Sequence, residues 1–218
     1  AAGKHLLELI NDILDLSKVE AGRVEVERIA CAAHAVVLEV VQVLAVRGNE
    51  KGITLQFEAR GAIPETVRTD PGRLRQIVTN LVGNALKFTE HGGVRVVLRL
   101  AQHGAEPVLA VDVIDTGIGI APDQLDNVFA AFVQADSSIA RRFGGTGLGL
   151  SISKRFAQAL GGDVRVTSEP GKGSTFTVTV KTGPLDGIRL LQPDEIVAEE
   201  QAAGEAAGAW EFPPAKVL

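Results

Sequence analysis

The chain has 218 residues, of which 45% are hydrophobic and 22% are charged, and its formal net charge is −5. This composition is typical of a globular protein, and the mild acidity argues against nucleic acid as a partner, because phosphate backbones call for a basic surface. The single cysteine, Cys31, excludes a disulfide framework within the chain, and no apolar run approaches the ~20 residues needed to span a bilayer. We therefore expect a cytoplasmic location, within a parent protein that could be membrane-anchored elsewhere.

Residues 4–20 carry apolar side chains at three- and four-residue spacing, which predicts a long amphipathic helix that ends near Gly22. The chain starts inside this pattern and contains no methionine, so we expect it to be part of a longer protein. The apolar stripe predicts burial in a two-helix hairpin or dimer interface, with packing against the following domain as the alternative.

Residues 24–69 predict two short strands, one helix and a loop. Alternating residues predict strands at 24–29 and 53–57, and helical spacing of valine and leucine predicts a helix at 33–47. Pro64 marks residues 61–69 as a loop.

A second helix is predicted from Asp70-Pro71 to about Phe88, because Asp caps free N–H groups and Pro is tolerated at the first helical position. Its spacing places Asn80, Asn84 and Lys87 on one face. Asparagine is a mediocre helix former, so this face indicates either a functional site or an ordinary polar surface.

The second half of the chain predicts two strand pairs and two helices. Strands at 94–100 and 108–115 are joined by a short loop, which favours an antiparallel pair. A short helix at 122–128 and a polar segment at 134–142 precede a helix at 147–160, and strands at 163–168 and 175–180 flank a glycine turn at 171–173. From residue 183 the pattern dissolves, and we predict a linker or loosely packed tail over 183–218.

Two glycine clusters frame the predicted functional region. The first follows Asp115 and contains Gly117 and Gly119; the second contains Gly145, Gly147 and Gly149 and precedes a predicted helix. Glycines permit positive φ angles or close approach of a ligand to the backbone, and N–H groups at a helix N-terminus bind anions. We therefore expect a pocket with a carboxylate at one end and a phosphate site at the other.

Residues 1–181 resemble the ATP-binding catalytic core of bacterial sensor histidine kinases, particularly the hybrid type. Four blocks occur in the order of that family: 80–89 resembles the N box, 115–120 the G1 box, 129–132 the F box and 145–150 the G2 box, and 171–176 resembles the last glycine turn. The resemblance implies an α/β (α+β) fold, a two-layer sandwich with a mixed sheet known as the Bergerat fold of the GHKL superfamily, preceded here by one long amphipathic helix.

The resemblance also implies ATP and Mg²⁺ as cofactors and assigns roles to residues. Asp115 would accept a hydrogen bond from adenine, Asn84 would ligate Mg²⁺, Lys87 and Arg142 would pair with phosphate, and Thr175 would close the adenine pocket. The implied catalytic residues are Asn80, Asn84 and Lys87. The implied nucleotide site comprises Asn84, Lys87, Phe88, Asp115, Gly117, Gly119, Ile120, Arg142, Gly145, Thr146, Gly147, Leu148, Gly149 and Thr175.

Asn80 separates the branches of this superfamily. ATP-hydrolysing relatives carry a glutamate four residues before the metal-binding asparagine, and it acts as general base for water. An amide cannot take a proton at neutral pH, so the resemblance implies phosphoryl transfer to a side chain rather than hydrolysis of the gyrase or chaperone kind.

The resemblance divides the chain into three parts: residues 1–22 as the second helix of a dimerisation hairpin whose first helix is absent, 23–182 as the catalytic domain, and 183–218 as the linker or tail. It implies a protein-histidine kinase that transfers the γ-phosphoryl group of Mg·ATP to a histidine outside these residues, because Leu6-Leu7 after His5 does not match the acceptor pattern. The fragment alone is then expected to be inactive in autophosphorylation.

The implied partners are ATP and ADP, the phosphoacceptor histidine of its own or a partner hairpin, and a response regulator receiver domain in a phosphorelay. The full-length protein is expected to form a homodimer. One departure supports an alternative: the family usually has Glu-Pro between the F-box phenylalanines, where this chain has Ala130-Ala131. The alternative is a degenerate nucleotide-binding or regulatory module without transfer activity.

Overall fold

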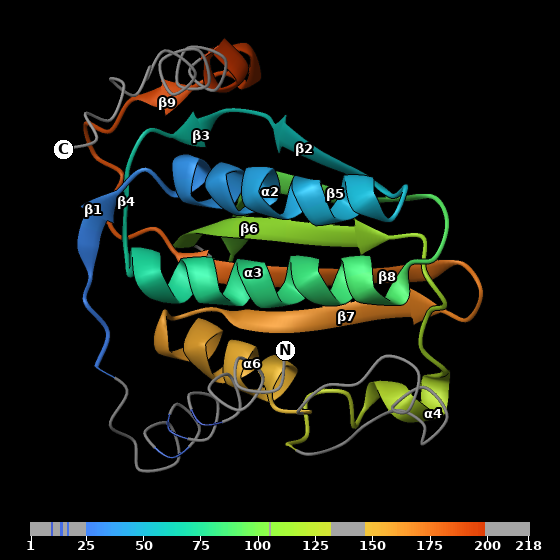
Figure 1. Cartoon of the computed structure of the whole chain (residues 1–218). Helices are drawn as coiled ribbons and strands as arrows, with labels where there is room; N and C mark the ends of the chain where they lie inside the picture. Colours follow the sequence, from blue (N-terminus) through green and yellow to red (C-terminus); the bar gives the residue numbers. More distant parts are fainter. Residues whose placement is uncertain are drawn as a thin grey trace, which may run out of the picture.

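A computed structural model of the chain describes residues 10, 14, 17, 25–104, 106–131 and 147–198. Its centre is a five-stranded mixed sheet with helices on one face (Figure 1). The strands in spatial order are β2 (Thr54–Arg60), β5 (Gly93–His103), β6 (Glu106–Asp115), β8 (Gly173–Lys181) and β7 (Asp163–Glu169). β2 runs parallel to β5, and the other neighbours are antiparallel. The predicted two-layer sandwich with a mixed sheet is confirmed.

Three helices form the second layer: α2 (Ala33–Glu50), α3 (Pro71–Phe88) and α6 (Gly149–Ala159). α3 begins as predicted, with Asp70 Oδ1 accepting a hydrogen bond from the backbone N–H of Arg73 at 2.9 Å and Pro71 at the first helical position. It ends at Phe88 and is capped by Thr89, whose hydroxyl donates to the carbonyl oxygen of Ala85 at 2.7 Å. The next helix, α4 (Pro122–Leu125), is shorter than the predicted 122–128, because the chain continues from it in turns.

The apolar core lies between the helices and one face of the sheet, and α3 runs through its middle. One stripe of α3 is fully buried: Leu74, Ile77, Val78, Leu81 and Val82 are each 0% exposed. Because this stripe faces the core, the polar side chains of α3 lie along the edge of the stripe, where Asn80 donates a hydrogen bond to Ser153 of α6.

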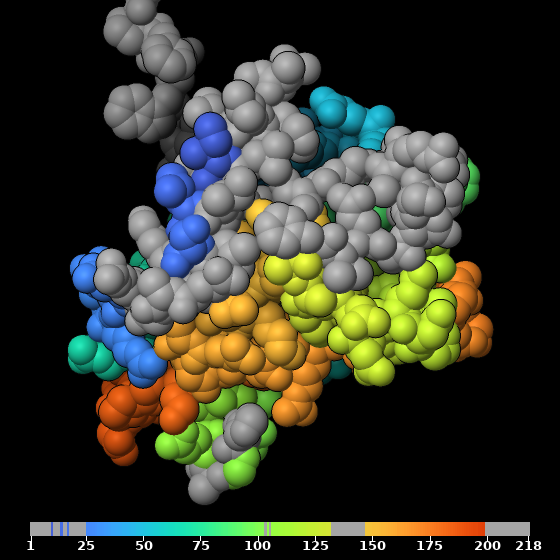
Figure 2. All heavy atoms as spheres, turned by 90° about the horizontal axis from the view of Figure 1, so that it is seen from below, coloured from blue at the N-terminus to red at the C-terminus, as the bar shows by residue number. Residues whose placement is uncertain are grey.

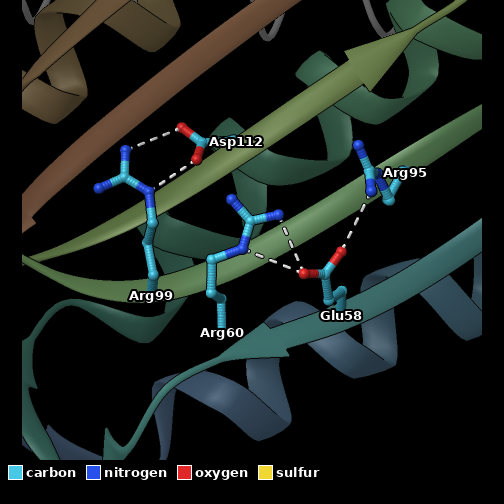
Figure 3. A network of polar contacts seen from close by, with 5 residues as sticks. All are labelled: Glu58, Arg60, Arg95, Arg99 and Asp112. Carbon is cyan, nitrogen blue, oxygen red and sulfur yellow. Dashed lines mark hydrogen bonds and ion pairs between the residues drawn. The ribbon is translucent and has the colours of Figure 1, made fainter.

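The opposite face of the sheet carries a network of ion pairs (Figure 3). The guanidinium of Arg99 binds the carboxylate of Asp112 through two hydrogen bonds of 2.8 and 3.3 Å, and Thr177 donates to the same carboxylate at 2.7 Å. Glu58 lies between Arg60 and Arg95 and pairs with both. The strand alternation therefore separates an apolar face under the helices from a charged face opposite it.

Four very short strands depart from the sequence-based expectation. β1 (Ile29–Cys31) pairs with β4 (Val67–Thr69), and β3 (Ile63–Pro64) pairs with β9 (Leu190–Leu191). The predicted strand at 24–29 is thus shifted toward Cys31, and the predicted loop at 61–69 contains two strands. Segments of two or three residues show no hydrophobic period, so their pairing could not be recognised from sequence.

The prediction of a linker or loosely packed tail is wrong for residues 183–198. After β9 the chain forms a helical turn at 193–198, and the side chains of Leu191 and Ile196 are 0% and 1% exposed. The reason is tertiary: β3 offers a strand edge to β9, and the two apolar side chains join the main core. The division of the chain into domains otherwise stays a prediction.

Most of the predicted helix at 4–20 lies outside the described residues. Positions 10, 14 and 17 are helical, and the side chains of Ile10 and Leu14 are 44% and 54% exposed. In the described ranges, no helix combines the length and the apolar character required to cross a membrane.

Candidate functional site

Asp115 ends the central strand β6 and is the most deeply buried acidic side chain at this end of the sheet, with 7% exposure. Its Oδ1 accepts hydrogen bonds from the backbone N–H groups of Gly117 at 2.8 Å and Ser174 at 3.2 Å. Burial raises the pKa of this carboxyl above its ordinary value, and the two backbone hydrogen bonds partly oppose the rise. Within the described ranges both of its hydrogen bonds go to Oδ1, so Oδ2 can accept one from a ligand.

The glycines after Asp115 allow the loop to press against the protein's own backbone. A Cβ atom on Gly117 would lie 2.5 Å from the carbonyl oxygen of Phe88, and one on Gly119, whose φ is 69°, would overlap the carbonyl oxygen of Glu169. The backbone N–H of Ile118 donates to the same Phe88 oxygen at 3.3 Å. The contacts with Phe88 join the loop after β6 to the end of α3, and the contact of Gly119 with Glu169 joins it to the end of β7.

The register of β8 corrects one predicted residue. Ser174 lies opposite Asp115, whereas Thr175 lies opposite Ile114. Because neighbouring strand residues point to opposite faces, the side chain of Thr175 lies on the face away from Asp115 and cannot close a pocket there. Ser174 lies beside Asp115 instead: its backbone N–H donates to Asp115, and its hydroxyl lies 2.9 Å from the hydroxyl of Ser168.

Ser168 and Ser174 were missed by sequence reasoning. The Ser168 hydroxyl accepts a hydrogen bond from the backbone N–H of Ile120 at 2.8 Å and contacts the carbonyl oxygen of Gly173 at 2.9 Å. It therefore connects the loop after β6 to the start of β8. Residues two apart on a strand share a face, so counting back from the apolar Phe176 would have placed Ser174 on the core face of the sheet.

The polar edge of α3 contains Asn80, Asn84, Lys87 and Phe88. The amide nitrogen of Asn84 donates to Oδ1 of Asn80 at 3.4 Å, and the amide nitrogen of Asn80 donates to the hydroxyl of Ser153 at 2.9 Å. The Lys87 ammonium lies 4.8 Å from the centroid of the Phe88 ring, and burial lowers the pKa of Lys87. The predicted polar face of α3 is thus half-buried and hydrogen-bonded rather than a freely solvated surface.

The N-terminus of α6 lies against this edge of α3. Gly147 has a φ of 70°, Leu148 is 1% exposed, and a Cβ on Gly149 would overlap Oδ1 of Asn80. The first N–H groups of a helix lack intrahelical partners and carry a partial positive charge, so they can bind an anion. Of the predicted second cluster, Gly147, Leu148 and Gly149 are placed at this terminus, whereas Arg142, Gly145 and Thr146 lie outside the described residues, as do Phe132 and the segment 134–142.

The structure therefore assembles three elements around one region: the end of β6 with Asp115, the polar edge of α3, and the start of α6. α3 contacts both of the others, through Phe88 and through Asn80. A carboxylate acceptor, an amide oxygen, an ammonium and the first N–H groups of a helix are the groups needed to hold a base, a metal ion and phosphates.

Comparison with known proteins agrees with this arrangement. Residues 69–184, more than half of the chain, match the family described as "Histidine kinase-, DNA gyrase B-, and HSP90-like ATPase". The chain belongs to this family. The matched range spans all three elements of the site, so this is an ATP-binding domain of the kind found in histidine kinases.

Its relatives include signal-transduction and sensor kinases. The chain is 44% identical over 176 residues to the signal transduction histidine-protein kinase BarA of Escherichia coli K12, covering 80% of this chain and 19% of BarA. It is 39% identical over 207 residues to the autoinducer 2 sensor kinase/phosphatase LuxQ of Vibrio parahaemolyticus, covering 91% of this chain and 24% of LuxQ. The chain thus spans about a fifth of the length of the curated relatives it matches.

A solved structure shares the fold over most of the chain. Full-length ShkA in complex with AMPPNP superposes with a TM-score of 0.72 at 36% identity, covering 84% of this chain and 37% of ShkA. The Acinetobacter baumannii histidine kinase AdeS gives a TM-score of 0.66 at 22% identity and covers 83% of this chain and 80% of that one, which supports the fold alone.

Proposed function

We propose that this domain binds Mg·ATP and transfers the γ-phosphoryl group to a histidine on a helical hairpin, as the catalytic part of a two-component sensor histidine kinase. The observation that carries the proposal is the pair of asparagines on the edge of α3. Asn80 occupies the place of a general base, and its amide is engaged by Ser153 and Asn84. An amide cannot accept a proton from water, so the site favours transfer over hydrolysis.

The base end of the ligand would lie at Asp115. An ionised carboxylate is an acceptor-only group, and the exocyclic amino group of adenine is a donor. Because two backbone N–H groups hold Oδ1, the orientation of Oδ2 is fixed before a ligand arrives. Such preorganisation reduces the ordering that binding requires.

The phosphate end would lie between α3 and α6. The donor set fits Mg²⁺ and ATP: the amide oxygen of Asn84 is a hard oxygen ligand, and Lys87 and the N-terminus of α6 can face phosphate oxygens. Bound Mg²⁺ would bridge the phosphates and reduce their charge. In the described part of the chain, no group of three or more His, Cys, Asp or Glu side chains could hold a metal ion. Because Mg²⁺ commonly keeps waters and phosphate oxygens as ligands, the nucleotide and water would supply the remaining ones.

The acceptor and the partners are inferred from the family resemblance rather than from the site itself. From the resemblance to sensor histidine kinases, we infer that the parent protein dimerises through its hairpin, passes the phosphoryl group to a receiver domain, and carries residues 23–182 as its catalytic domain in the cytoplasm.

Calorimetry with Mg·ATP on the wild-type chain and on Asn84→Ala tests the metal role. We expect the affinity of Asn84→Ala to fall about ten-fold or more in Mg²⁺ and to change little in excess chelator, since one oxygen ligand is lost. Thr79→Ala, an exposed residue of the same helix, is the matched control and should bind like wild type. Equal affinity of Asn84→Ala and wild type in Mg²⁺ would refute the role of Asn84.

A second candidate function is a nucleotide-binding module without transfer activity, which Ala130-Ala131 in place of the usual Glu-Pro motivates. A purified hairpin that carries its histidine, mixed with this domain and γ-labelled ATP, separates the two. Label on the hairpin supports the kinase. ATP binding without label on the hairpin supports the module.

A further inference from the structure

Lys154 on α6 holds an unusual position between two elements. Its ammonium donates to the carbonyl oxygen of Val164 at 3.1 Å and lies 3.3 Å from Oδ1 of Asp163, both on β7. The same ammonium lies 4.5 Å from the centroid of the Phe129 ring, in the turns after α4. The Lys154 side chain is only 30% exposed, so these contacts are partly shielded from water.

Phe129 is in turn held against the core. Its ring meets that of Phe176 edge to face, with centroids 6.4 Å apart and planes at 85°. Phe176 is 7% exposed and lies on β8, two residues after Ser174. Figure 2 shows the α4 region, in yellow-green, lying directly against the orange surface of α6 and β7.

This contact links the two sides of the nucleotide site. Phe129 belongs to the chain that leads away from the base end after Asp115 and Ile120, whereas Lys154 belongs to the helix whose first residue, Gly149, lies at the phosphate end. Ala130 and Ala131 follow Phe129 without a proline to restrict the backbone. The contact of the ammonium with the ring is therefore one restraint on this part of the chain, beside the packing of Phe129 on Phe176.

We propose that Lys154 is a positioning residue for the phosphate side of the site. By holding Phe129 to α6 and β7, it fixes the position of the start of α6 relative to Asp115. The inference rests on the proposed nucleotide site. A cation over a partly buried ring contributes enough to change affinity by roughly three- to ten-fold when it is lost.

The test measures the affinities of Mg·ATP and AMP for wild type, Lys154→Met, Lys154→Arg, Phe129→Leu and Lys181→Met. Lys154→Met keeps the aliphatic stem without the charge, and Phe129→Leu keeps the charge without the ring. We expect both variants to lose roughly three- to ten-fold more affinity for ATP than for AMP. Lys154→Arg should bind both nucleotides like wild type, because a guanidinium also stacks on rings. The control Lys181→Met removes an exposed ion pair with Glu106 and should leave both affinities unchanged.

Three outcomes would overturn the proposal. Equal losses for ATP and AMP would mean that Lys154 only supports the fold. A selective loss in Lys154→Met that Phe129→Leu does not reproduce would mean that Lys154 acts through its charge or its contacts with β7 and not through the ring. Wild-type protein that binds neither nucleotide would overturn the proposed function and this inference with it.

Unfolding of each variant is followed in parallel, and Lys154→Gln replaces Lys154→Met if the latter does not fold. The double variant Lys154→Met/Phe129→Leu should lose less ATP affinity than the sum of the single losses, as expected for two groups of one contact. Additive losses would count against the contact.

Discussion

Two aspartates on strand β6, three residues apart, behave in opposite ways. Asp112 points to the open face of the sheet, where Arg99 and Thr177 donate hydrogen bonds to it. Asp115 points to the opposite face, where, among the described residues, its hydrogen bonds come from backbone N–H groups. For Asp112, burial acts to raise the pKa, but the hydrogen bonds from Arg99 and Thr177 and the charge of Arg99 have the larger effect, and the net result is a lowered pKa. For Asp115, burial dominates and the pKa is raised. A paired carboxylate stabilises the fold, whereas one without a charged partner is suited to bind a ligand.

The largest expected effect is on binding through Asp115. Asp115→Asn should lower ATP affinity about 10- to 100-fold, because a hydrogen bond to a charged group is lost and the new amide can present its nitrogen to the donor of the base. Asp112→Asn should change the affinity less than two-fold. Calorimetry on both variants measures this difference, and similar losses for the two would mean that the faces are not functionally distinct.

The next effect is on the free energy of unfolding, where Asp112 should matter more to stability than Asp115. Asp112→Ala should lower the free energy of unfolding by about 1–3 kcal/mol, because Arg99 and Thr177 lose their acceptor while Arg99 keeps some access to water. Asp115→Asn should raise it by about 1 kcal/mol, since a buried charge is removed. Urea unfolding at neutral pH measures both, and a stabilised Asp112→Ala would contradict the comparison.

The two aspartates should change the free energy of unfolding in different pH ranges, one below and one above the ordinary pKa of 3.8. The pKa of Asp112 is lowered in the folded protein, so its contribution to stability is present above pH 3.8 and is lost as the pH falls through the folded pKa. The folded pKa of Asp115 is raised, so wild type loses stability relative to Asp115→Asn as pH rises from 3.8 through the folded value. Unfolding curves of the two Asn variants from pH 2 to 7 should therefore diverge from wild type in different windows.

The smallest effect tests the register at β8. Ser174→Ala should weaken ATP binding by about three- to ten-fold, because its hydroxyl belongs to the cluster with Ser168 beside Asp115. Thr175→Val, on the other face, should change the affinity less than two-fold. A larger loss in Thr175→Val than in Ser174→Ala would restore the sequence-based assignment.

Much of the fold follows from local signals. Asp70-Pro71 starts α3, and the spacing from Leu74 to Val82 sets its buried stripe, so the placement of Asn80 and Asn84 on its edge was predictable. The strand pair that ends in Asp115 was also predictable, because its members are long and joined by a short loop.

Other features depend on contacts between distant residues. The pairing of β3 with β9 joins residues more than a hundred positions apart and leaves no periodic pattern. The contact of Lys154 with Phe129, and the pairing of Arg99 with Asp112, connect residues whose types are common on any surface. Such contacts are set by packing, which no single segment encodes.

The sequence by itself determined the family, the position of the three helices and five main strands, and the chemistry gathered at Asn84, Lys87 and Asp115. The tertiary structure decided which partners these side chains meet: the register of β6 and β8 placed Ser174 rather than Thr175 opposite Asp115, and packing gave Asp112 and Asp115 different hydrogen-bond partners and opposite pKa shifts. The physical reason is strand alternation, since a displacement of one residue along β8 moves a side chain from the core face to the open face.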